Sequence, residues 1–129
     1  MEYKVDNPFL DFLGINLVKW TDGYVEFLVD VQPHHLNRSA KMHGGLLATL
    51  LDVGCAYPGL YNRQGDILHS ATLSLTINYV KSVAPSKVLT KGKLIGGGRK
   101  IYFSEAYVYD EHGQVVAYAQ GTFKRLGSS

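Results

Sequence analysis

The chain has 129 residues, 46% of them hydrophobic, and this size predicts a single globular domain over residues 1–129. Thirteen Lys and Arg residues against eleven Asp and Glu residues give a formal charge of +2, so the basic excess typical of a nucleic-acid-binding protein is absent. One cysteine, no secretory signal at the start and no apolar run of the roughly 18 residues that span a bilayer together predict a cytoplasmic protein outside the membrane.

The predicted elements begin with residues 8–13, a short amphipathic segment that we expect to form one or two helical turns. Residues 24–31, "YVEFLVDV", then have the period-2 pattern of a strand with one buried face, which consists of Val25, Phe27, Val29 and Val31. The Asp22-Gly23 pair before them is a hairpin signal and pairs this strand with a preceding one. The only long helical pattern begins near Gly45.

Four strands are predicted after the helix. In residues 72–80, "TLSLTINYV", polar and apolar residues alternate without interruption, which predicts a strand with one wet face. The turn signals "GGGRK" and "DEHGQ" divide the following residues into three strands of a meander. This order of elements indicates an α+β fold in which a curved antiparallel sheet of five to six strands wraps around one long helix. The uncovered sheet edges predict a homo-oligomer.

The helix has two sides of different composition when its residues are placed about 100° apart. Its broad apolar side, which we expect to face the sheet, consists of Leu46, Leu47, Leu50, Leu51, Val53 and Gly54. The opposite stripe contains small residues and one carboxylate: Gly45, Ala48, Thr49, Asp52, Cys55, Ala56 and Gly59. A stripe of small residues leaves space beside the helix.

Asp52 in this stripe has two interpretations. The stripe packs against the helix of a symmetry mate and Asp52 pairs locally, or Asp52 lies at the edge of a slot that water can reach. Close packing alone does not explain a carboxylate there, because burying one without a partner or a use is costly. A carboxylate beside a slot is a candidate general base or nucleophile. Cys55, one turn later, has no nearby base in the sequence and is expected to pack in the interior.

Gly44 and Gly45 stand at the predicted start of the helix. The first amides of a helix have no internal acceptors and carry the positive end of the helix dipole. Without side chains, these two residues can approach a ligand closely, and a helix N-terminus aimed at a carbonyl group stabilises a developing oxyanion. His43 precedes them and either makes a structural hydrogen bond or orients a substrate.

The five histidines and the acidic residues show no metal-ligand spacing, so no metal is expected. The adjacent His34 and His35 follow Pro33 in a predicted loop. We expect both at the surface.

The stretch "HLNRSAKMHGGLLATLLD" resembles the signature of hotdog-fold acyl-CoA thioesterases of the phenylacetate-pathway (PaaI-like) family, and the resemblance covers nearly the whole chain. The motif combines Asn37 six residues before His43, the His-Gly-Gly sequence, and Asp52 nine residues after His43. The resemblance implies a long central helix inside a curved antiparallel sheet. It also implies dimers joined edge to edge, which pair into homotetramers, with active sites at the dimer interface.

The resemblance further implies the roles of individual residues. Asn37 and the amide of Gly44 would polarise the thioester carbonyl group, while Asp52 of the other subunit would activate water or attack directly. The position that is serine or threonine in the family falls on Thr72, which would help to position the water. His43 also matches the motif, with a less defined duty.

Substrate-binding residues are implied in the same way. Gly45 matches the motif, and basic residues near a glycine turn bind the CoA phosphates in the family, which indicates Arg99 and Lys100, with Lys81 as a further candidate. Pro58 departs from the family pattern and should end or kink the helix.

Two tyrosines follow the helical pattern, Tyr57 and Tyr61. They would suit an aromatic acyl group as the lining of an acyl pocket, with core packing as the alternative for either.

The function that this sequence predicts is hydrolysis of an aromatic or short-to-medium acyl-CoA to free acid and CoA. No cofactor is expected, since CoA is part of the substrate. One alternative is a hydratase or dehydratase of acyl thioesters, which would need His43 and Asp52 to converge on the acyl chain, but the Asn-Pro-Leu-His signature of such enzymes is absent. The other is a non-catalytic acyl-CoA-binding domain, which would need an attached DNA-binding segment for which 129 residues leave no room.

Overall fold

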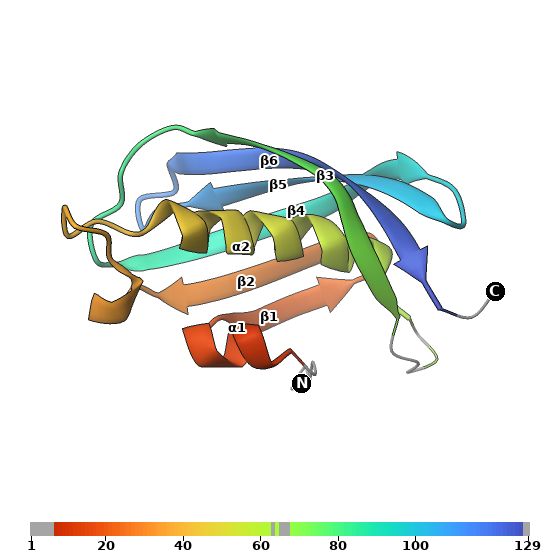
Figure 1. Cartoon of the computed structure of the whole chain (residues 1–129), viewed down its shortest axis with the longest axis horizontal. Helices are drawn as coiled ribbons and strands as arrows, with labels where there is room; N and C mark the ends of the chain where they lie inside the picture. The colour runs from red at the N-terminus through yellow and green to blue at the C-terminus, as the bar shows by residue number, and fades with distance from the viewer. Residues whose placement is uncertain (1–6, 63, 65–67, 128–129) are drawn as a thin grey trace.

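The computed structural model describes residues 7–62, 64 and 68–127 and shows a six-stranded antiparallel sheet that curves around one long helix (Figure 1). The helical elements are α1 (Pro8–Leu13), α2 (Gly44–Ala56) and two 3₁₀ turns, η1 (Pro33–His35) and η2 (Tyr57–Gly59). The strands are β1 (Asn16–Thr21), β2 (Tyr24–Asp30), β3 (His69–Tyr79), β4 (Lys87–Gly97), β5 (Ile101–Tyr109) and β6 (Val115–Leu126). The predicted α+β fold is confirmed.

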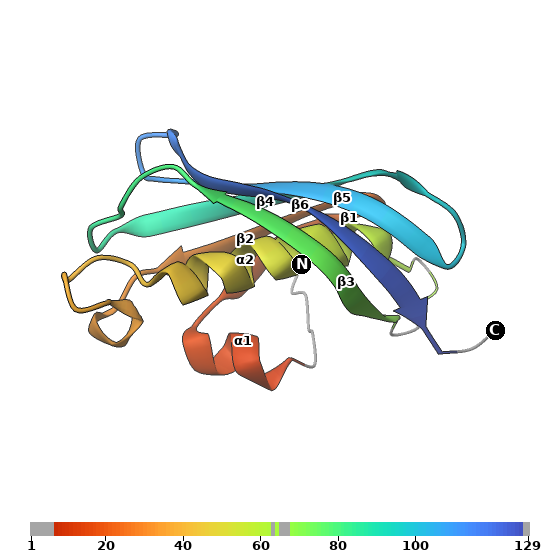
Figure 2. The same ribbon diagram turned by 45° about the horizontal axis from the view of Figure 1, so that its top comes forward.

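The strand order in the sheet is β1-β2-β4-β5-β6-β3, and every neighbouring pair is antiparallel. The hairpin between β1 and β2 turns at Gly23, whose φ of 82° suits a glycine. β4, β5 and β6 form the predicted meander, whereas β3 pairs with β6 at the far edge of the sheet. Figure 2 shows the sheet curving over α2. The strand order places β1 and β3 at its two edges. No helix in the described ranges is long and apolar enough to cross a membrane.

The apolar side of α2 lies against the concave face of the sheet, as predicted. All six residues assigned to that side are buried, and Leu50 and Leu51 have no exposed surface. Across from them, the largest fully buried side chains of the sheet are Tyr102, Phe27 and Phe123. Removing a side chain of this size from water contributes about 1.5–3 kcal/mol, so this layer holds the helix in place.

The C-terminal half of α2 and the following turn η2 lie so close to the sheet that glycine is needed at some of the contact positions. A Cβ atom on Gly92 of β4 would overlap the carbonyl group of Gly54, and a Cβ atom on Gly59 would overlap the ring of Tyr102. α2 ends at Ala56 and continues into η2, which contains Pro58, as the sequence predicted.

Two carbonyl groups at the junction of α2 and η2 receive side-chain donors from the sheet. The hydroxyl of Tyr102 donates to the carbonyl of Ala56 at 2.6 Å, and the indole nitrogen of Trp20 donates to the carbonyl of Tyr57 at 2.9 Å. The carbonyl of Tyr57 also accepts from the amide of Leu60 at 2.9 Å. The C-terminal end of α2 is therefore closed by both packing and hydrogen bonds.

The predicted stripe of small residues on α2 is wrong at two positions. Cys55 and Gly59 are buried in the core. Cys55 lies about 60° from Asp52 around the helix, on the side of the sheet, and Gly59 follows the point where the α-helix has ended. The remaining members of the stripe are exposed or partly exposed: Gly45, Ala48, Thr49, Asp52 and Ala56.

The predicted uninterrupted alternation of β3 is also wrong, because the strand contains a bulge. The register with β6 shifts between Thr72 and Ser74, so Leu73 is the extra residue and is 55% exposed. Thr72 pairs with Phe123, which is buried in the core under the sheet. The bulge thus turns Thr72 toward α2, whereas strict alternation would have placed it on the wet face.

His35 is buried, although its position after Pro33 predicted a surface residue. Its Nδ1 atom accepts a hydrogen bond from the amide of Gln32 at 2.9 Å, and its Nε2 atom donates to the carbonyl of Leu13 at 2.7 Å. These partners fix the neutral tautomer with the proton on Nε2. The buried ring joins η1 to the end of α1 and supports the loop that leads to α2.

Candidate active site

The N-terminal end of α2 is capped by His43. The Nδ1 atom of His43 accepts from the amide of Gly45 at 2.7 Å, and its backbone carbonyl accepts from the amides of Leu46 and Leu47. The amide of Gly44 has no acceptor among the described residues. Of the two glycine amides predicted to face a ligand, Gly44 is therefore the one that can donate to it, while Gly45 completes the cap.

Asn37 is held in a tight loop that leaves its amide nitrogen ready to donate. Its Oδ1 atom accepts from the amides of Ser39 at 2.9 Å and Lys41 at 3.1 Å, and its backbone amide donates to the carbonyl of Lys41 at 2.7 Å. Both loop bonds use the side-chain oxygen, and Nδ2 has no acceptor in the part of the chain that the structure describes.

The same loop contains Ala40, which has a φ of 60° and is the only non-glycine residue with a positive φ in the described part of the chain. A left-handed alanine costs on the order of 1 kcal/mol, and such strain is concentrated at functional sites. The strain is consistent with a loop shaped to hold Asn37.

An open depression lies beside this loop, lined by Leu36, Asn37, Arg38, Ser39 and His43. It joins the predicted residues Asn37 and His43 and adds Arg38, which the sequence analysis did not select. Arg38 is exposed and has no acidic partner in the described ranges. Its position directly after the motif asparagine was the only available signal.

Asp52 forms a hydrogen-bonded pair with Thr72. The hydroxyl of Thr72 donates to Oδ1 of Asp52 at 2.8 Å, which joins the third turn of α2 to the edge strand β3. Asp52 is partly exposed and Thr72 is exposed, so water reaches both side chains. The structure therefore combines the two interpretations of Asp52, since the carboxylate has a local partner and is also accessible.

The Asp52 pair and the Gly44 amide belong to different regions of one chain. Eight residues of α-helix separate Gly44 from Asp52, which is about 12 Å along the helix axis. A single carbonyl group cannot contact both. β3 touches both regions, because Thr72 near its start binds Asp52, and the hydroxyl of Tyr79 at its end donates to the carbonyl of Gly44 at 3.2 Å.

Cys55 lies next to Asp52 in the helix but is fully buried. Burial, with a smaller contribution from the charges of Asp52 and Glu105, raises the pKa of its thiol to about 12. A thiol with this pKa is not a nucleophile at neutral pH, because the thiolate is the reactive form.

The two candidate pocket tyrosines lie at the closed end of α2. Tyr57 is buried against Trp20 and Phe27, and its hydroxyl accepts from the side-chain amide of Asn7 at 3.2 Å. Tyr61 is partly buried with its ring edge on Trp20. Both belong to one aromatic cluster with Trp20.

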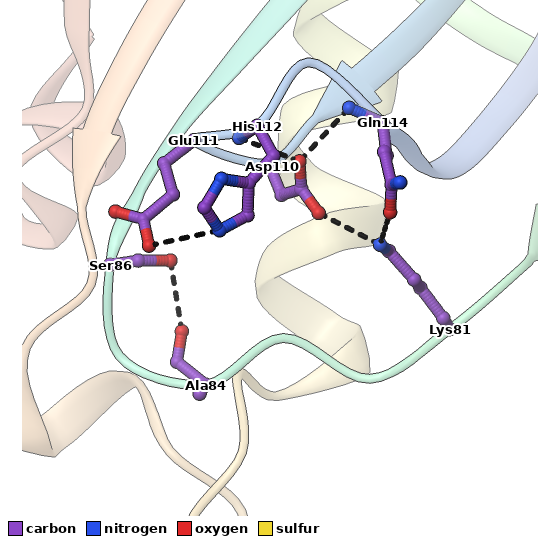
Figure 3. Close-up of polar contacts among 7 residues, drawn as sticks. All are labelled: Lys81, Ala84, Ser86, Asp110, Glu111, His112 and Gln114. Atoms are coloured by element: carbon purple, nitrogen blue, oxygen red, sulfur yellow. Dashed lines mark hydrogen bonds and ion pairs between the residues drawn. The ribbon is translucent and has the colours of Figure 1, made fainter.

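Lys81, a predicted phosphate ligand, is already paired in this chain. Figure 3 shows its ammonium group between Asp110 and Gln114, with 2.8 Å to Oδ2 of Asp110. The hydrogen bond from Lys81, followed by backbone donors of Gln114 and His112, lowers the pKa of the Asp110 carboxyl to about 2. The pair joins the β3–β4 connection to the β5–β6 turn.

Arg99 and Lys100 lie exposed in the β4–β5 turn, at the opposite end of the molecule from the start of α2 (Figure 1). Arg125 organises this turn, although it belongs to no motif in the sequence. Its Nη1 atom donates to the carbonyls of Gly98 at 2.7 Å and Arg99 at 3.0 Å, and its Nε atom donates to the carbonyl of Gly59 at 2.9 Å.

Comparisons with known proteins indicate the family of this chain. The model of the family described as the thioesterase superfamily matches residues 40–117. A protein of Archaeoglobus fulgidus, named as a candidate esterase, is 26% identical over 125 residues, which are 96% of this chain and 78% of that protein.

Solved structures share the fold. A conserved protein from Pseudomonas aeruginosa has a TM-score of 0.82 and 31% identity, over 93% of this chain and 94% of that one. The PaaI protein of the E. coli phenylacetic acid degradation operon has a TM-score of 0.85 and 22% identity, over 96% and 88% of the two chains. A mutant of PaaI from Thermus thermophilus has a TM-score of 0.79 and 26% identity, over 93% and 100%. The expected hotdog fold is confirmed.

Proposed function

The chain belongs to the thioesterase superfamily and is a thioester hydrolase, and we propose that its substrate is an acyl-CoA, which it cleaves to free acid and CoA. The observation that carries this proposal is the Asp52 carboxylate, held by the Thr72 hydroxyl at 2.8 Å on the accessible side of α2. A positioned carboxylate with a free oxygen and access to water suits the attack on a thioester carbonyl. We propose that the acyl group of the substrate is aromatic or of short to medium length.

The donors at the start of α2 supply the other half of the chemistry. The carbonyl oxygen of the thioester accepts from the amide of Gly44 and from Nδ2 of Asn37, and both donors stabilise the oxyanion as it forms. Asp52 either takes a proton from the attacking water or attacks the carbonyl carbon itself to form an anhydride that water then cleaves. In both routes the C–S bond breaks and CoA leaves as the thiolate.

The separation of about 12 Å between Gly44 and Asp52 supports a site formed by two subunits. β3 is an edge strand with exposed apolar side chains, Leu73 and Tyr79, and such an edge is a template for pairing with a second chain. Antiparallel pairing of two β3 strands brings the Tyr79 end of one strand toward the Thr72 end of the other. Each site then combines Asn37 and Gly44 of one subunit with Asp52 and Thr72 of its partner.

The outer face of the sheet supports a further pairing of dimers into a tetramer. Phe103 of β5 and Ile95 of β4 are about half exposed. Exposed aromatic and apolar side chains of this kind are typical of an interaction surface.

The phosphates of CoA need cations, and the chain offers two groups of them. Arg38 lines the depression next to Asn37, whereas Arg99 and Lys100 lie in the β4–β5 turn. The two groups can be distinguished by the KM values of the Arg38→Gln and Arg99→Gln variants. Each variant is measured with an acyl-CoA and with the matching acyl-pantetheine, which lacks the phosphates. The residue that contacts phosphate is the one whose loss raises the KM for acyl-CoA about 5-fold or more and leaves the KM for acyl-pantetheine unchanged.

Hydration of an acyl thioester is the weaker alternative. Nδ1 of His43 accepts from the amide of Gly45 at 2.7 Å and thereby caps α2. This nitrogen is therefore not available to move a proton on the acyl chain.

The test is free-thiol release from short-chain, medium-chain and aromatic acyl-CoAs by the wild type and by Asp52→Asn. We expect hydrolysis by the wild type and a fall in kcat of about 100-fold or more in the variant, with an unchanged circular dichroism spectrum. Asp30→Asn, a change of an exposed aspartate on β2, is the matched control and should leave the rate unchanged. Absence of thiol release from every thioester, or an Asp52→Asn variant as fast as the parent, would contradict the proposal.

A further inference from the structure

The peptide group between Gly44 and Gly45 is held from both sides. The hydroxyl of Tyr79 donates to its carbonyl oxygen at 3.2 Å, and its N–H group donates to Nδ1 of His43 at 2.7 Å. The carbonyl of Gly44 and the N–H of Gly45 belong to one planar unit. Two bonds at opposite ends of this unit therefore fix its plane relative to β3 and to the side chain of His43.

This peptide group needs such support because neither residue has a side chain. Glycine explores φ and ψ more widely than any other residue, and a helix start made of two glycines is the least rigid choice. The N–H of Gly44, the proposed oxyanion donor, is separated from the held plane only by rotations about the bonds to the Cα of Gly44. Fixing that plane therefore limits the directions in which the Gly44 amide can point.

The ring of Tyr79 also lies next to Gly44. A Cβ atom on Gly44 would lie 3.5 Å from this ring, which is ordinary van der Waals distance, so the ring lies beside Gly44 with room for about one methyl group between them. Tyr79 is 55% exposed, and burial in the core does not explain its presence. Tyr118 on the neighbouring strand is also exposed, at 38%, but its hydroxyl has no hydrogen-bond partner among the described residues.

We propose that Tyr79 is a positioning residue for thioester hydrolysis, which acts by holding the Gly44–Gly45 peptide so that the amide of Gly44 points at the substrate carbonyl. This inference rests on the proposed role of Gly44. A preorganised donor costs no reorganisation when charge develops on the oxygen, so a loosened donor lowers the rate of the chemical step. Tyr79 differs from Asp52 and Asn37 in that it works through the backbone and not on the substrate.

The experiment compares Tyr79→Phe with Tyr118→Phe, which removes an equivalent exposed hydroxyl from β6. Tyr79→Phe keeps the ring beside Gly44 and loses only the hydrogen bond. We expect kcat to fall about 10-fold with KM within about 2-fold of the wild type and an unchanged melting temperature, whereas Tyr118→Phe leaves kcat unchanged. An unchanged kcat in Tyr79→Phe overturns the inference, and so does a raised KM with unchanged kcat, which would indicate a direct substrate contact.

A double-mutant cycle with His43 separates positioning from a general structural effect. Tyr79 and His43 hold the same peptide group, so Tyr79→Phe should reduce kcat less in a His43→Ala background than in the wild type. Fully additive effects would overturn the inference.

A readout without substrate distinguishes failure of this inference from failure of the proposed function. By NMR, hydrogen exchange of the Gly45 amide should become about 10-fold faster in Tyr79→Phe and stay unchanged in Tyr118→Phe. If no thioester is hydrolysed but the exchange accelerates, Tyr79 does hold the Gly44–Gly45 peptide and the proposed function is wrong. If the exchange does not change, Tyr79 does not hold this peptide and the inference is refuted.

Discussion

The two ends of α2 are built on different principles. At the C-terminal end, a Cβ atom on Gly59 would overlap the ring of Tyr102, and the carbonyls of Ala56 and Tyr57 accept from Tyr102 and Trp20. At the N-terminal end, Gly45 and His43 are exposed and are held by hydrogen bonds alone. The closed end is fixed by packing, and the open end is fixed by polar contacts.

The glycines at the two ends show what this difference means. Gly92 and Gly59 are required by sterics, because a Cβ atom would overlap neighbouring atoms at either position. At Gly44 a Cβ atom would only make ordinary contact with the ring of Tyr79. The packing of this chain therefore does not require glycine at position 44, which leaves the approach of a ligand or a second subunit as the physical reason for it.

The largest effect is expected from Gly92→Ala at the closed end. The new methyl group would overlap the carbonyl group of Gly54, so helix and sheet must separate. Overpacking of this kind costs about 3 kcal/mol or more, which lowers the melting temperature on the order of 10 °C. Gly96→Ala on the same strand, where a Cβ atom meets nothing within 4 Å, is the control and should change the melting temperature little. Equal melting temperatures for the two variants would refute the close approach of α2 to β4.

Gly44→Ala at the open end should have the opposite profile. We expect a melting temperature within about 2 °C of the wild type, because the added methyl group fits beside Tyr79. The same methyl group obstructs the approach of the thioester carbonyl to the amide, so kcat/KM should fall about 10-fold or more. Thiol-release kinetics and thermal melts on the same samples test both statements. A fully active Gly44→Ala variant would show that no ligand closely approaches this glycine.

The smallest effect concerns the ion pair that supports the open end. Lys81 precedes Val83, whose carbonyl accepts from the amide of Met42 at 2.8 Å, immediately before His43. The hydrogen bond from Lys81 lowers the pKa of Asp110 from 3.8 to about 2. The folded state thus favours the charged carboxylate, so this contribution to stability is complete above about pH 4 and is lost as the pH falls toward 2.

Asp110→Asn should therefore be slightly less stable than the wild type at pH 6, and the two proteins should converge as the pH approaches 2. Urea unfolding midpoints between pH 6 and pH 2.5 measure this difference. Glu111→Gln, which changes an exposed carboxylate in the same turn, serves as the control. A difference that stays constant over this pH range would show that the Asp110 carboxylate does not act through its charge.

Strong periodicity made most of the fold predictable. The apolar side of α2, the β1–β2 hairpin and the meander of β4 to β6 follow from patterns that continue over several residues. The placement of β3 beside β6 did not follow, because no local pattern specifies which edge of the sheet a strand joins after a helix. The interior position of His35 was missed because its partners, Gln32 and Leu13, are backbone groups that leave no signal in composition.

The candidate site was predictable as a set of residues but not as an arrangement. The motif identified Asn37, Gly44 and Asp52, and the resemblance added Thr72. The contact between Thr72 and Asp52 depends on a bulge at Leu73 that simple alternation excludes. The function of Tyr79 depends on a hydrogen bond to a backbone carbonyl, which no sequence pattern marks.

Each proposed site takes Asp52 from one subunit and Asn37 from the other, and subunit complementation can detect this arrangement. Asp52→Asn and Asn37→Ala proteins are each expected to be nearly inactive. Refolding them together in equal amounts should restore about a quarter of the wild-type activity, because half of the dimers are hybrids and each hybrid has one intact site.

Asp52→Asn mixed with Thr72→Ala is the control, since both changes affect the same half of the site and no hybrid regains an intact one. Hybrid formation is confirmed by native mass spectrometry. Recovery of activity in the first mixture but not in the second is the predicted result. If hybrids of Asp52→Asn and Asn37→Ala form and stay inactive, the two-subunit site is contradicted.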